Sequence, residues 1–367
     1  MRVGICGGGI GGLAAAIGLV SLGHDVEVFE RSPDLRATGA GLNLWPNAVR
    51  ALYGLGLREP YDRIAVKLDR YLGYAPDGKL LFEKDTSGWP AKYGAPSTGV
   101  YRLALNTMLA DAYGADRIRY GSEVVSVENK ADTAVCHFSG GESFEADVII
   151  GADGINSAIR TQLIGGVKFR PNEHHAFRFR SVIDLDLVDV DPAAQTGIYT
   201  PGGWLSVIPI GGGKAYWFGS VSGARNVDEF IAYFASWDRT HIPRTISLTP
   251  RDSIVESPLL DVDGTPYTWT QGRVTLLGDA AHPMMPDLAQ GASQTFLDAL
   301  ALRDVFAETG DVDEALRRYE AIRRPAANYV VERSKKGSYL GKHRVDPVAF
   351  RYEDEIEAVG KDEHVPA

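Results

Sequence analysis

The stretch of sequence that decides the fold is residues 2–30, RVGICGGGIGGLAAAIGLVSLGHDVEVFE. Its first apolar run predicts a strand, and Gly7, Gly9 and Gly12 then fill the positions of a GxGxxG motif before an apolar helix. In such a motif the first glycine makes a tight turn, the second lets the backbone approach a pyrophosphate, and the third lets the helix pack closely on the sheet. A second apolar run ends at Glu30, where an acid typically binds an adenosine ribose. This order of elements predicts a Rossmann-like nucleotide-binding fold.

Two dinucleotides suit this unit, FAD and NAD(P), and the residues at its end favour FAD. Arg31 would attract the 2′-phosphate of NADP, but the carboxylate of Glu30 beside it would repel that phosphate. FAD is therefore the first choice.

A second informative stretch, GRVTLLGDAAHPMMPDLAQGASQTFLDAL, covers residues 272–300. Residues 274–277 indicate a buried strand, and Asp279 follows at its carboxyl end, where open α/β sheets bind their ligands. A helix then begins near Gly291, and its start offers backbone N–H groups and roughly half a positive charge to an anion. The acid and the helix start together suit a ligand with a polyol arm and a ring that becomes negative, such as a reduced flavin. Taken alone, the stretch fits equally well an ordinary strand, loop and helix in which the Asp caps a turn.

Polar groups follow other predicted elements as well. The stretch DVIIGADGINSAIR, residues 147–160, is again a buried strand that ends on a carboxylate, Asp153, and a glycine. Alone, it would also fit a strand that leaves the sheet through a turn. Arg102 stands at the start of a helix, where the helix dipole opposes a cation, so a ligand explains it better than stability does.

The composition is that of an ordinary globular protein, with 367 residues of which 44% are hydrophobic and 23% charged. The net charge of −10 argues against binding to nucleic acid and against stable membrane association, both of which need clustered positive charge. No run approaches ~18 apolar residues, and no signal peptide fits before the first strand. Cys6, one of 2 cysteines, lies in an apolar strand. We therefore expect a cytoplasmic protein without a disulfide or a metal site.

The order of the elements predicts an α/β fold with an α+β insert. Residues 174–222 hold several β-rich runs separated by Pro and Gly turns, which indicates an antiparallel sheet. Residues 71–84 read as a hairpin that joins this sheet, and residues 243–270 as largely irregular. We expect a discontinuous Rossmann-like FAD-binding domain, a substrate domain, and a C-terminal helix or tail. Their predicted extents are 1–70, 98–170 and 271–340 for the first, 71–97 and 171–270 for the second, and 341–367 for the third.

Three motifs now stand in order: GGGIGG with Glu30, DVIIGADGINSAIR, and GDAAHPMMPDLAQGAS. This combination resembles the single-component FAD-dependent aromatic hydroxylases of the p-hydroxybenzoate hydroxylase type over nearly the whole chain. Within that family, residues 43–47 and 286–291 are most similar to urate, salicylate and 6-hydroxynicotinate hydroxylases. Trp204 stands where the urate enzymes carry a substrate-binding Arg, which argues against urate and for a less anionic or more aromatic substrate.

The resemblance implies a non-covalent FAD that is contacted by residues from all three motifs. Gly11 and its neighbours would approach the pyrophosphate, Glu30 the adenosine ribose, and Asp279 the ribityl or pyrophosphate region. Residues 289–293 would face the pyrimidine edge of the flavin. The full set of expected cofactor-binding residues is Gly9, Gly11, Glu30, Arg31, Asn43, Arg102, Val124, Asp153, Asp279, Ala289, Gln290, Gly291, Ala292 and Ser293.

The resemblance also implies a reaction, in which NAD(P)H binds transiently and reduces FAD. O₂ then forms a flavin C4a-hydroperoxide, which hydroxylates an aromatic or heteroaromatic, phenol-like substrate. Such a site must exclude water and help to ionise the substrate. The alternatives are a flavin-dependent reductase or dehydrogenase on the same fold that inserts no oxygen, and a non-catalytic flavoprotein sensor. We expect a monomer or a homodimer.

The antiparallel sheet should supply the substrate-binding groups. Tyr216 would bind or help to deprotonate the substrate, unless it only packs in the core. Arg178 and Arg180 share one face of a strand, where one would bind a carboxylate or phenolate, unless both face solvent. Asp287 is a candidate base or substrate acceptor, although capping a helix is the commoner role. His282 is a weaker candidate base, because a His in a turn after a strand is more often structural.

Overall fold

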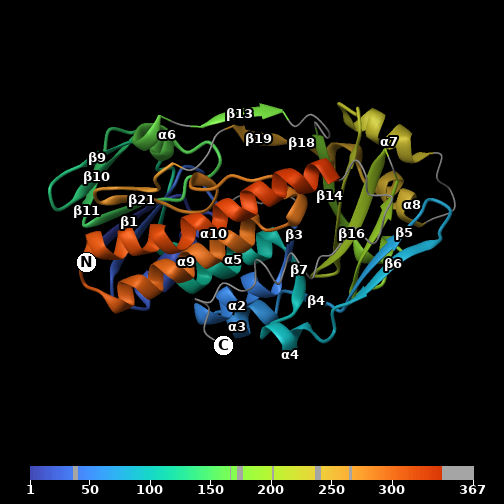
Figure 1. Ribbon diagram of the computed structural model, residues 1–367, viewed down its shortest axis with the longest axis horizontal. Coiled ribbons are helices and arrows are strands. Elements are labelled where there is room, and N and C mark those ends of the chain that lie inside the picture. Colours follow the sequence, from blue (N-terminus) through green and yellow to red (C-terminus); the bar gives the residue numbers. More distant parts are fainter. Residues whose placement is uncertain are drawn as a thin grey trace.

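The computed structural model of the chain describes residues 1–35, 40–165, 167–171, 177–200, 202–235, 241–263 and 267–340. Within these residues the chain forms two bodies that lie side by side along the long axis of the molecule (Figure 1). The predicted C-terminal helix or tail, residues 341–367, lies outside the described residues.

The first body is built on a six-stranded sheet that draws on both ends of the chain. Its spatial order is β20 (Thr270–Gln271), β21 (Val274–Leu276), β12 (Val148–Gly151), β1 (Arg2–Cys6), β2 (Asp25–Glu30) and β8 (Ile118–Tyr120). All neighbours are parallel except β20 and β21. The residues of β12 and β21 are all buried, as expected for parallel strands covered on both faces.

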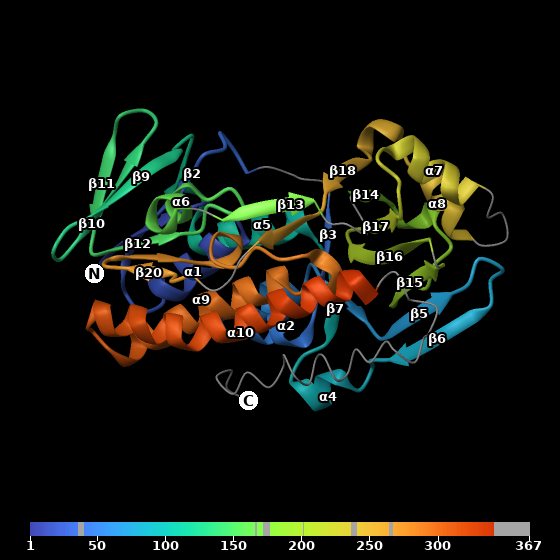
Figure 2. The same cartoon turned by 45° about the horizontal axis from the view of Figure 1, so that its top comes forward.

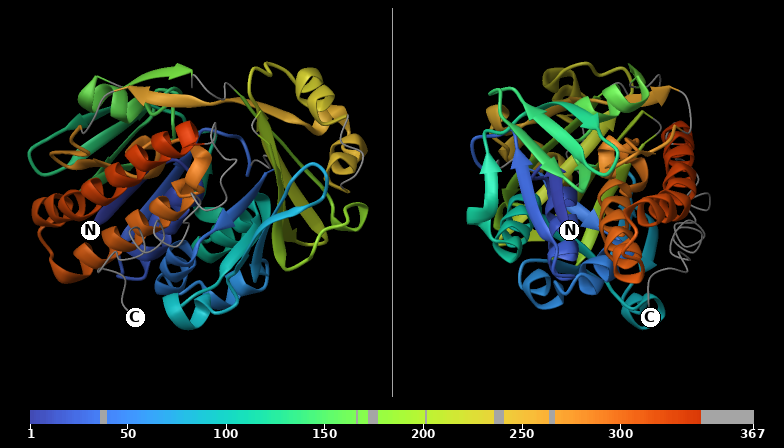
Figure 3. Two further views of the ribbon diagram at one scale, coloured as in Figure 1. Left: turned by 45° about the vertical axis from the view of Figure 1, so that its right-hand side comes forward. Right: turned by 90° about the vertical axis from the view of Figure 1, so that its left-hand side faces the viewer.

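Helices and a small sheet cover this central sheet. The two long C-terminal helices run side by side along it, coloured orange and red in Figure 3. A three-stranded antiparallel sheet lies at the end of the molecule that carries the N-terminus (Figure 2). The helices are α1 (Ile10–Val20), α2 (Pro46–Gly54), α3 (Arg58–Asp62), α5 (Arg102–Tyr113), α6 (Ala158–Ile164), α9 (Gly291–Glu308) and α10 (Val312–Leu340). The strands of the small sheet are β9 (Val124–Asn129), β10 (Ala134–Phe138) and β11 (Ser143–Ala146).

The second body is a seven-stranded sheet with two helices on one face. Its order is β18 (Val255–Pro258), β14 (Phe177–Asp184), β17 (Lys214–Val221), β16 (Gly203–Gly211), β15 (Ala194–Tyr199), β5 (Arg70–Tyr74) and β6 (Leu80–Asp85). Every pair is antiparallel except β15 and β5. The hairpin β5–β6 therefore joins this sheet, as predicted. The helices α7 (Val227–Ala235) and α8 (His241–Leu248) cover it through a core that includes Phe179, Trp217 and Phe230.

Smaller elements connect the two bodies. A three-stranded sheet has the order β3 (Gly41–Leu44), β7 (Ser97–Tyr101) and β4 (Val66–Leu68). A ribbon of β13 (Lys168–Pro171) and β19 (Leu260–Asp263) runs along the top of the molecule in Figure 1. The remaining elements are α4 (Trp89–Tyr93) and the 3₁₀ turns Ala115–Arg117, Leu185–Leu187, Arg251–Ser253, Gly278–Ala280 and Pro286–Leu288.

The predicted fold class is confirmed: a Rossmann-like body carries an antiparallel sheet as an insert and ends in helices. The expectation that residues 243–270 are irregular is wrong, because most of α8 and all of β18 and β19 lie there. The domain boundaries stay a prediction. Among the described residues, no helix is both long and apolar enough to cross a membrane.

Candidate functional site

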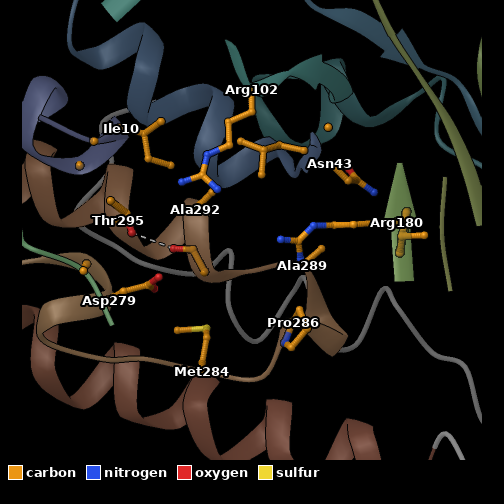
Figure 4. Close-up of a pocket in the computed structure, with 18 of the residues that line it drawn as sticks. Ile10, Asn43, Arg102, Arg180, Asp279, Met284, Pro286, Ala289, Ala292 and Thr295 are labelled. Atoms are coloured by element: carbon orange, nitrogen blue, oxygen red, sulfur yellow. Dashed lines mark hydrogen bonds between the residues drawn. The ribbon is translucent and has the colours of Figure 1, made fainter. Parts of the chain in front are cut away.

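A cavity of about 430 Å³ lies between the two bodies, and this volume is within the usual range of small-molecule sites. On the side of the first body its walls are the glycine turn after β1, the loop after β21 and the start of α9. On the other side they are β14, β16 and β17 (Figure 4). The cavity therefore lies where the two predicted functions, nucleotide binding and substrate binding, would meet.

The three motif glycines have different surroundings in the turn after β1. Gly7 has a φ of +120°, and a Cβ on it would lie 2.2 Å from the backbone oxygen of Ala152. A Cβ on Gly12 would lie 1.9 Å from the carbonyl oxygen of Gly7, so this turn closes directly onto α1. A Cβ on Gly9 would meet nothing within 4 Å, because Gly9 faces the cavity. The open space in front of Gly9 fits the close approach of a pyrophosphate.

Glu30 lies beside this turn rather than in the wall of the cavity. Its carboxylate accepts hydrogen bonds from the backbone N–H groups of Gly8 and Ser32, each at 2.8 Å. Arg31 follows it and is exposed, and Val124 begins β9. These three predicted residues do not line the cavity.

Asp279 lines the cavity and its side chain points into it (Figure 4). The backbone around it is held by Arg160, whose guanidinium donates to the carbonyl oxygens of Asp279 and Ala280 at 3.1 Å each. The same guanidinium also donates to the carbonyl oxygen of Ile155. Buried Arg160 therefore ties the loop after β12 to the loop after β21. The sequence shows Arg160 in its motif, but no local pattern indicates this contact with a loop more than 100 residues away.

The start of α9 faces the cavity without a side-chain cap. Gln290, at the N-cap position, makes no capping hydrogen bond, so the first N–H groups of the helix are available to a ligand. Ala289, Gly291 and Ala292 line the cavity. Gln290 and Ser293 do not: the side chain of Gln290 accepts a hydrogen bond from Asn47 at 3.1 Å, and Ser293 is completely buried.

Three arginines bring positive charge to the cavity. Arg102, Arg178 and Arg180 all line it, and the Nε atoms of Arg102 and Arg180 are buried without a hydrogen-bond partner among the described residues. The guanidinium of Arg178 pairs with the carboxylate of Asp287 at 3.4 Å, with both side chains nearly inaccessible to solvent. It also lies over the ring of Trp204, 4.6 Å from the ring centroid. Asp287 is therefore engaged by Arg178 and does not line the cavity.

Tyr216 and Phe218 project from β17 into the same space. Their rings stack with centroids 5.1 Å apart. Burial raises the pKa of the Tyr216 hydroxyl, although three nearby arginines oppose the rise. This tyrosine is therefore protonated at neutral pH, and its hydroxyl is available as a hydrogen-bond donor.

Three other predicted residues each have at least one polar atom engaged elsewhere. Asn43 lines the cavity, but its amide N–H groups donate to Gln195 at 2.8 Å and Tyr71 at 3.1 Å. The carboxylate of Asp153 accepts from the backbone N–H of Ile159 at 3.2 Å. His282 is completely buried outside the cavity, where its Nε2 lies 2.6 Å from a carboxylate oxygen of Asp298. The buried contact with Asp298 favours a structural role for His282 over a role as a base.

Comparisons with known proteins identify the family of the chain. The model of a family described as FAD binding domain matches residues 1–334. A FAD-dependent urate hydroxylase of Mycolicibacterium vanbaalenii is 34% identical, over 97% of this chain and 92% of that protein. Aurachin C monooxygenase/isomerase of Stigmatella aurantiaca is 32% identical, over 92% and 89%. The crystal structure of Klebsiella pneumoniae HpxO complexed with FAD and uric acid has a TM-score of 0.86 and 25% identity, and the match covers 100% of this chain and 96% of that one.

These findings confirm the family predicted from the three motifs, and FAD as the cofactor. The observations that fit FAD in this chain are the open space at Gly9, the uncapped start of α9 and the buried Nε of Arg102, which has no hydrogen-bond partner among the described residues. Which side chains contact the cofactor stays a prediction. The chain belongs to the family of single-component FAD-dependent aromatic hydroxylases, whose FAD binding domain spans nearly all of its described residues.

Proposed function

We propose that the protein is an NAD(P)H-consuming, FAD-dependent monooxygenase that hydroxylates an aromatic or heteroaromatic ring. The proposal rests on the single cavity between the two bodies, because its two opposite walls offer different binding groups. The wall of the first body offers Gly9, Asp279 and the start of α9, and the opposite wall offers Arg180 and Tyr216. The named activities of the relatives, urate hydroxylation and aurachin C monooxygenation, support this reaction class.

The first wall would hold the cofactor. Backbone at Gly9 and Gly11 would lie against the pyrophosphate, and Asp279 would accept hydrogen bonds from the ribityl hydroxyls. The start of α9 would lie at the flavin ring, where its N–H groups and dipole favour the negative charge that the ring gains on reduction. When bound and reduced by NAD(P)H, FAD supplies the activation of O₂ that no amino-acid side chain can provide.

The second wall would hold the substrate, and its two arginines differ. The guanidinium of Arg178 is already paired with the carboxylate of Asp287 and lies over the ring of Trp204. Among the described residues Arg180 has no carboxylate partner, and its Nε is buried without a hydrogen bond, so it is the cation that would pair with a substrate anion. A guanidinium close to a phenol or a carboxylate favours the ionised form of that group. The substrate is therefore an aromatic compound with an acidic oxygen.

Tyr216 would orient that substrate rather than take its proton. Because its pKa is raised, the hydroxyl is protonated at neutral pH and donates a hydrogen bond. Ile208, Phe218 and Leu259 add apolar surface to the cavity, which helps to keep water from the reacting atoms. The positive charge of Arg180 would lower the pKa of the bound substrate and so favour its ionised form.

The experiment is a panel of phenols and aromatic acids tested for stimulated NAD(P)H oxidation with matching O₂ consumption. We expect anionic members to stimulate both. With the best substrate, Arg180→Met should raise KM by about 10- to 100-fold, the usual value of a hydrogen-bonded charge pair, and leave flavin content unchanged. A panel with no stimulating compound would count against the proposal, and an unchanged KM in Arg180→Met would remove Arg180 from the substrate site.

A further inference from the structure

The loop that enters α9 holds an unusual backbone conformation at the wall of the cavity. Ala289 has a φ of 53° and a ψ of 32°, and it is the only non-glycine residue with a positive φ in the described part of the chain. A Cβ makes this left-handed conformation unfavourable. Such residues persist where the surrounding structure forces them, and they concentrate at functional sites.

The beginning of α2 supplies the groups that hold this loop. The indole N–H of Trp45 donates to the carbonyl oxygen of Leu288 at 3.0 Å, in a buried hydrogen bond. The amide of Asn47 donates to the side-chain oxygen of Gln290 at 3.1 Å. These two bonds fix the residues on either side of Ala289.

The Trp45 ring is itself held rigidly. It stacks on Tyr71 with centroids 5.5 Å apart and an interplanar angle of 10°, and it lies against Trp89 at 5.9 Å. The hydroxyl of Tyr71 is 2.6 Å from that of Ser97 on β7. Ala289 packs against this aromatic cluster from the cavity side.

The loop around Ala289 lies between the proposed cofactor-binding wall and the proposed substrate-binding wall of the cavity. Ala289 lines the cavity together with Gly291, Ala292 and Arg180, and Figure 4 labels Ala289, Ala292 and Arg180 in its wall. A shift of this loop would therefore change how the substrate sits relative to the start of α9. It would also open the wall that keeps water out.

We propose that Trp45 is a positioning residue, which acts through its hydrogen bond to Leu288 to keep Ala289 in the left-handed conformation that the reaction needs. The inference rests on the proposed function. In the coupled reaction, NAD(P)H, a proton, O₂ and the aromatic substrate give NAD(P)⁺, water and the hydroxylated product. When the loop moves, the same two electrons reduce O₂ with two protons to H₂O₂, and the substrate is left unchanged.

The test compares Trp45→Phe with Trp89→Phe. Both tryptophans are nearly fully buried in one cluster, so the two changes remove the same atoms from the same packing. Only Trp45 donates its indole N–H to the loop. We expect Trp45→Phe to lower the ratio of product formed to NAD(P)H consumed by about 2- to 10-fold, the effect of one buried hydrogen bond, and Trp89→Phe to change it little.

A second variant separates positioning from general damage. Glycine adopts a positive φ without the penalty of a Cβ, so Ala289→Gly added to Trp45→Phe should restore much of the lost coupling. The visible circular dichroism of bound flavin, measured without turnover, should change in Trp45→Phe and return in the double variant. Equal coupling in the two tryptophan variants, or no restoration by glycine, would overturn the inference.

The experiments also distinguish a failure of this inference from a failure of the proposed function. If the unaltered protein shows no substrate-dependent O₂ consumption, the proposed function fails. The flavin dichroism and the FAD affinity of the same variants then still decide whether Trp45 holds the loop. If Trp45→Phe does not fold, replacing Trp45 with benzothienylalanine, which keeps the shape of the indole but lacks its N–H donor, provides the same comparison.

Discussion

At the scale of single residues, two neighbouring glycines have different reasons to be glycine. Gly9 has open space where a Cβ would point, and its φ of −76° suits any residue. A Cβ on Gly11 would lie 2.6 Å from a methyl carbon of Thr295 and 2.7 Å from one of Leu277. The packing of α1 against Thr295 and Leu277 therefore explains Gly11, whereas Gly9 is explained by the ligand proposed above.

This difference predicts opposite behaviour for two alanine variants. Gly9→Ala should leave the melting temperature of the apoprotein nearly unchanged and weaken FAD binding by about 1–3 kcal/mol, the usual cost of an added methyl group in a packed contact. Gly11→Ala should already lower the melting temperature of the apoprotein. Thermal melts and fluorescence titrations with FAD measure both quantities. Normal FAD affinity in Gly9→Ala would contradict the position assigned to the pyrophosphate.

Trp204 illustrates how far one residue can be interpreted from the sequence. Its identity suggested a less anionic substrate, but the structure shows the guanidinium of Arg178 over its ring and Arg180 nearby in the same cavity. The cavity is therefore not short of positive charge. The alternation of Arg178 and Arg180 predicted their common face, but no sequence pattern shows that Asp287, 109 residues away, pairs with only one of them.

At the scale of elements, α9 and α10 are joined to the loop after β21 by buried charges. The carboxylate of Asp298 on α9 accepts from the Gly278 backbone N–H at 3.0 Å, lies 2.6 Å from His282 Nε2, and accepts from Arg323 of α10 at 2.9 Å. Burial alone would raise the pKa of Asp298, but the charges and hydrogen bonds of His282 and Arg323 outweigh it and lower the pKa. The cluster thus fixes the backbone directly before Asp279.

This cluster predicts a pH-dependent contribution to stability. Because the pKa of Asp298 is lowered in the folded state, its stabilising effect is complete above the ordinary value of 3.8 and is lost as the pH falls through the folded value. Asp298→Asn should cost about 3–5 kcal/mol near neutral pH, because it leaves the buried guanidinium of Arg323 without its carboxylate partner. The difference from the unaltered protein should shrink below pH ~4. Denaturant unfolding at several pH values measures it, and a difference that does not depend on pH would contradict this origin.

Other elements could be predicted only in part. The alternating pattern and the turn residues of 71–84 were enough to predict the β5–β6 hairpin, because its two strands are neighbours in the sequence and pair with each other. Residues 243–270 looked irregular because β18 and β19 are only four residues long each and pair with distant partners, β14 and β13. Short strands of this kind are defined by the neighbour they pair with rather than by their own sequence.

At the scale of the whole molecule, the site follows from the order of strands in one parallel sheet. β1, β12 and β21 are neighbours, so their carboxyl ends bring together Gly9, Asp153 and Asp279 from three distant parts of the chain. Each of these ends could be recognised in the sequence as an apolar run that stops at glycine or a carboxylate. The contacts between distant segments, such as Trp45 with Leu288 and Arg178 with Asp287, could not be recognised, because they depend on the tertiary structure.

The function of the whole molecule is either that of a monooxygenase or that of a reductase, and the two differ in whether an oxygen atom from O₂ enters the product. The measurement that tests the central claim most directly is turnover under ¹⁸O₂ in ordinary water, with NAD(P)H and the best substrate of the panel, followed by mass spectrometry of the product. We predict a product that carries one atom of ¹⁸O and none when the label is in the water instead. Product formation without O₂, or oxygen that comes from water, would contradict the account.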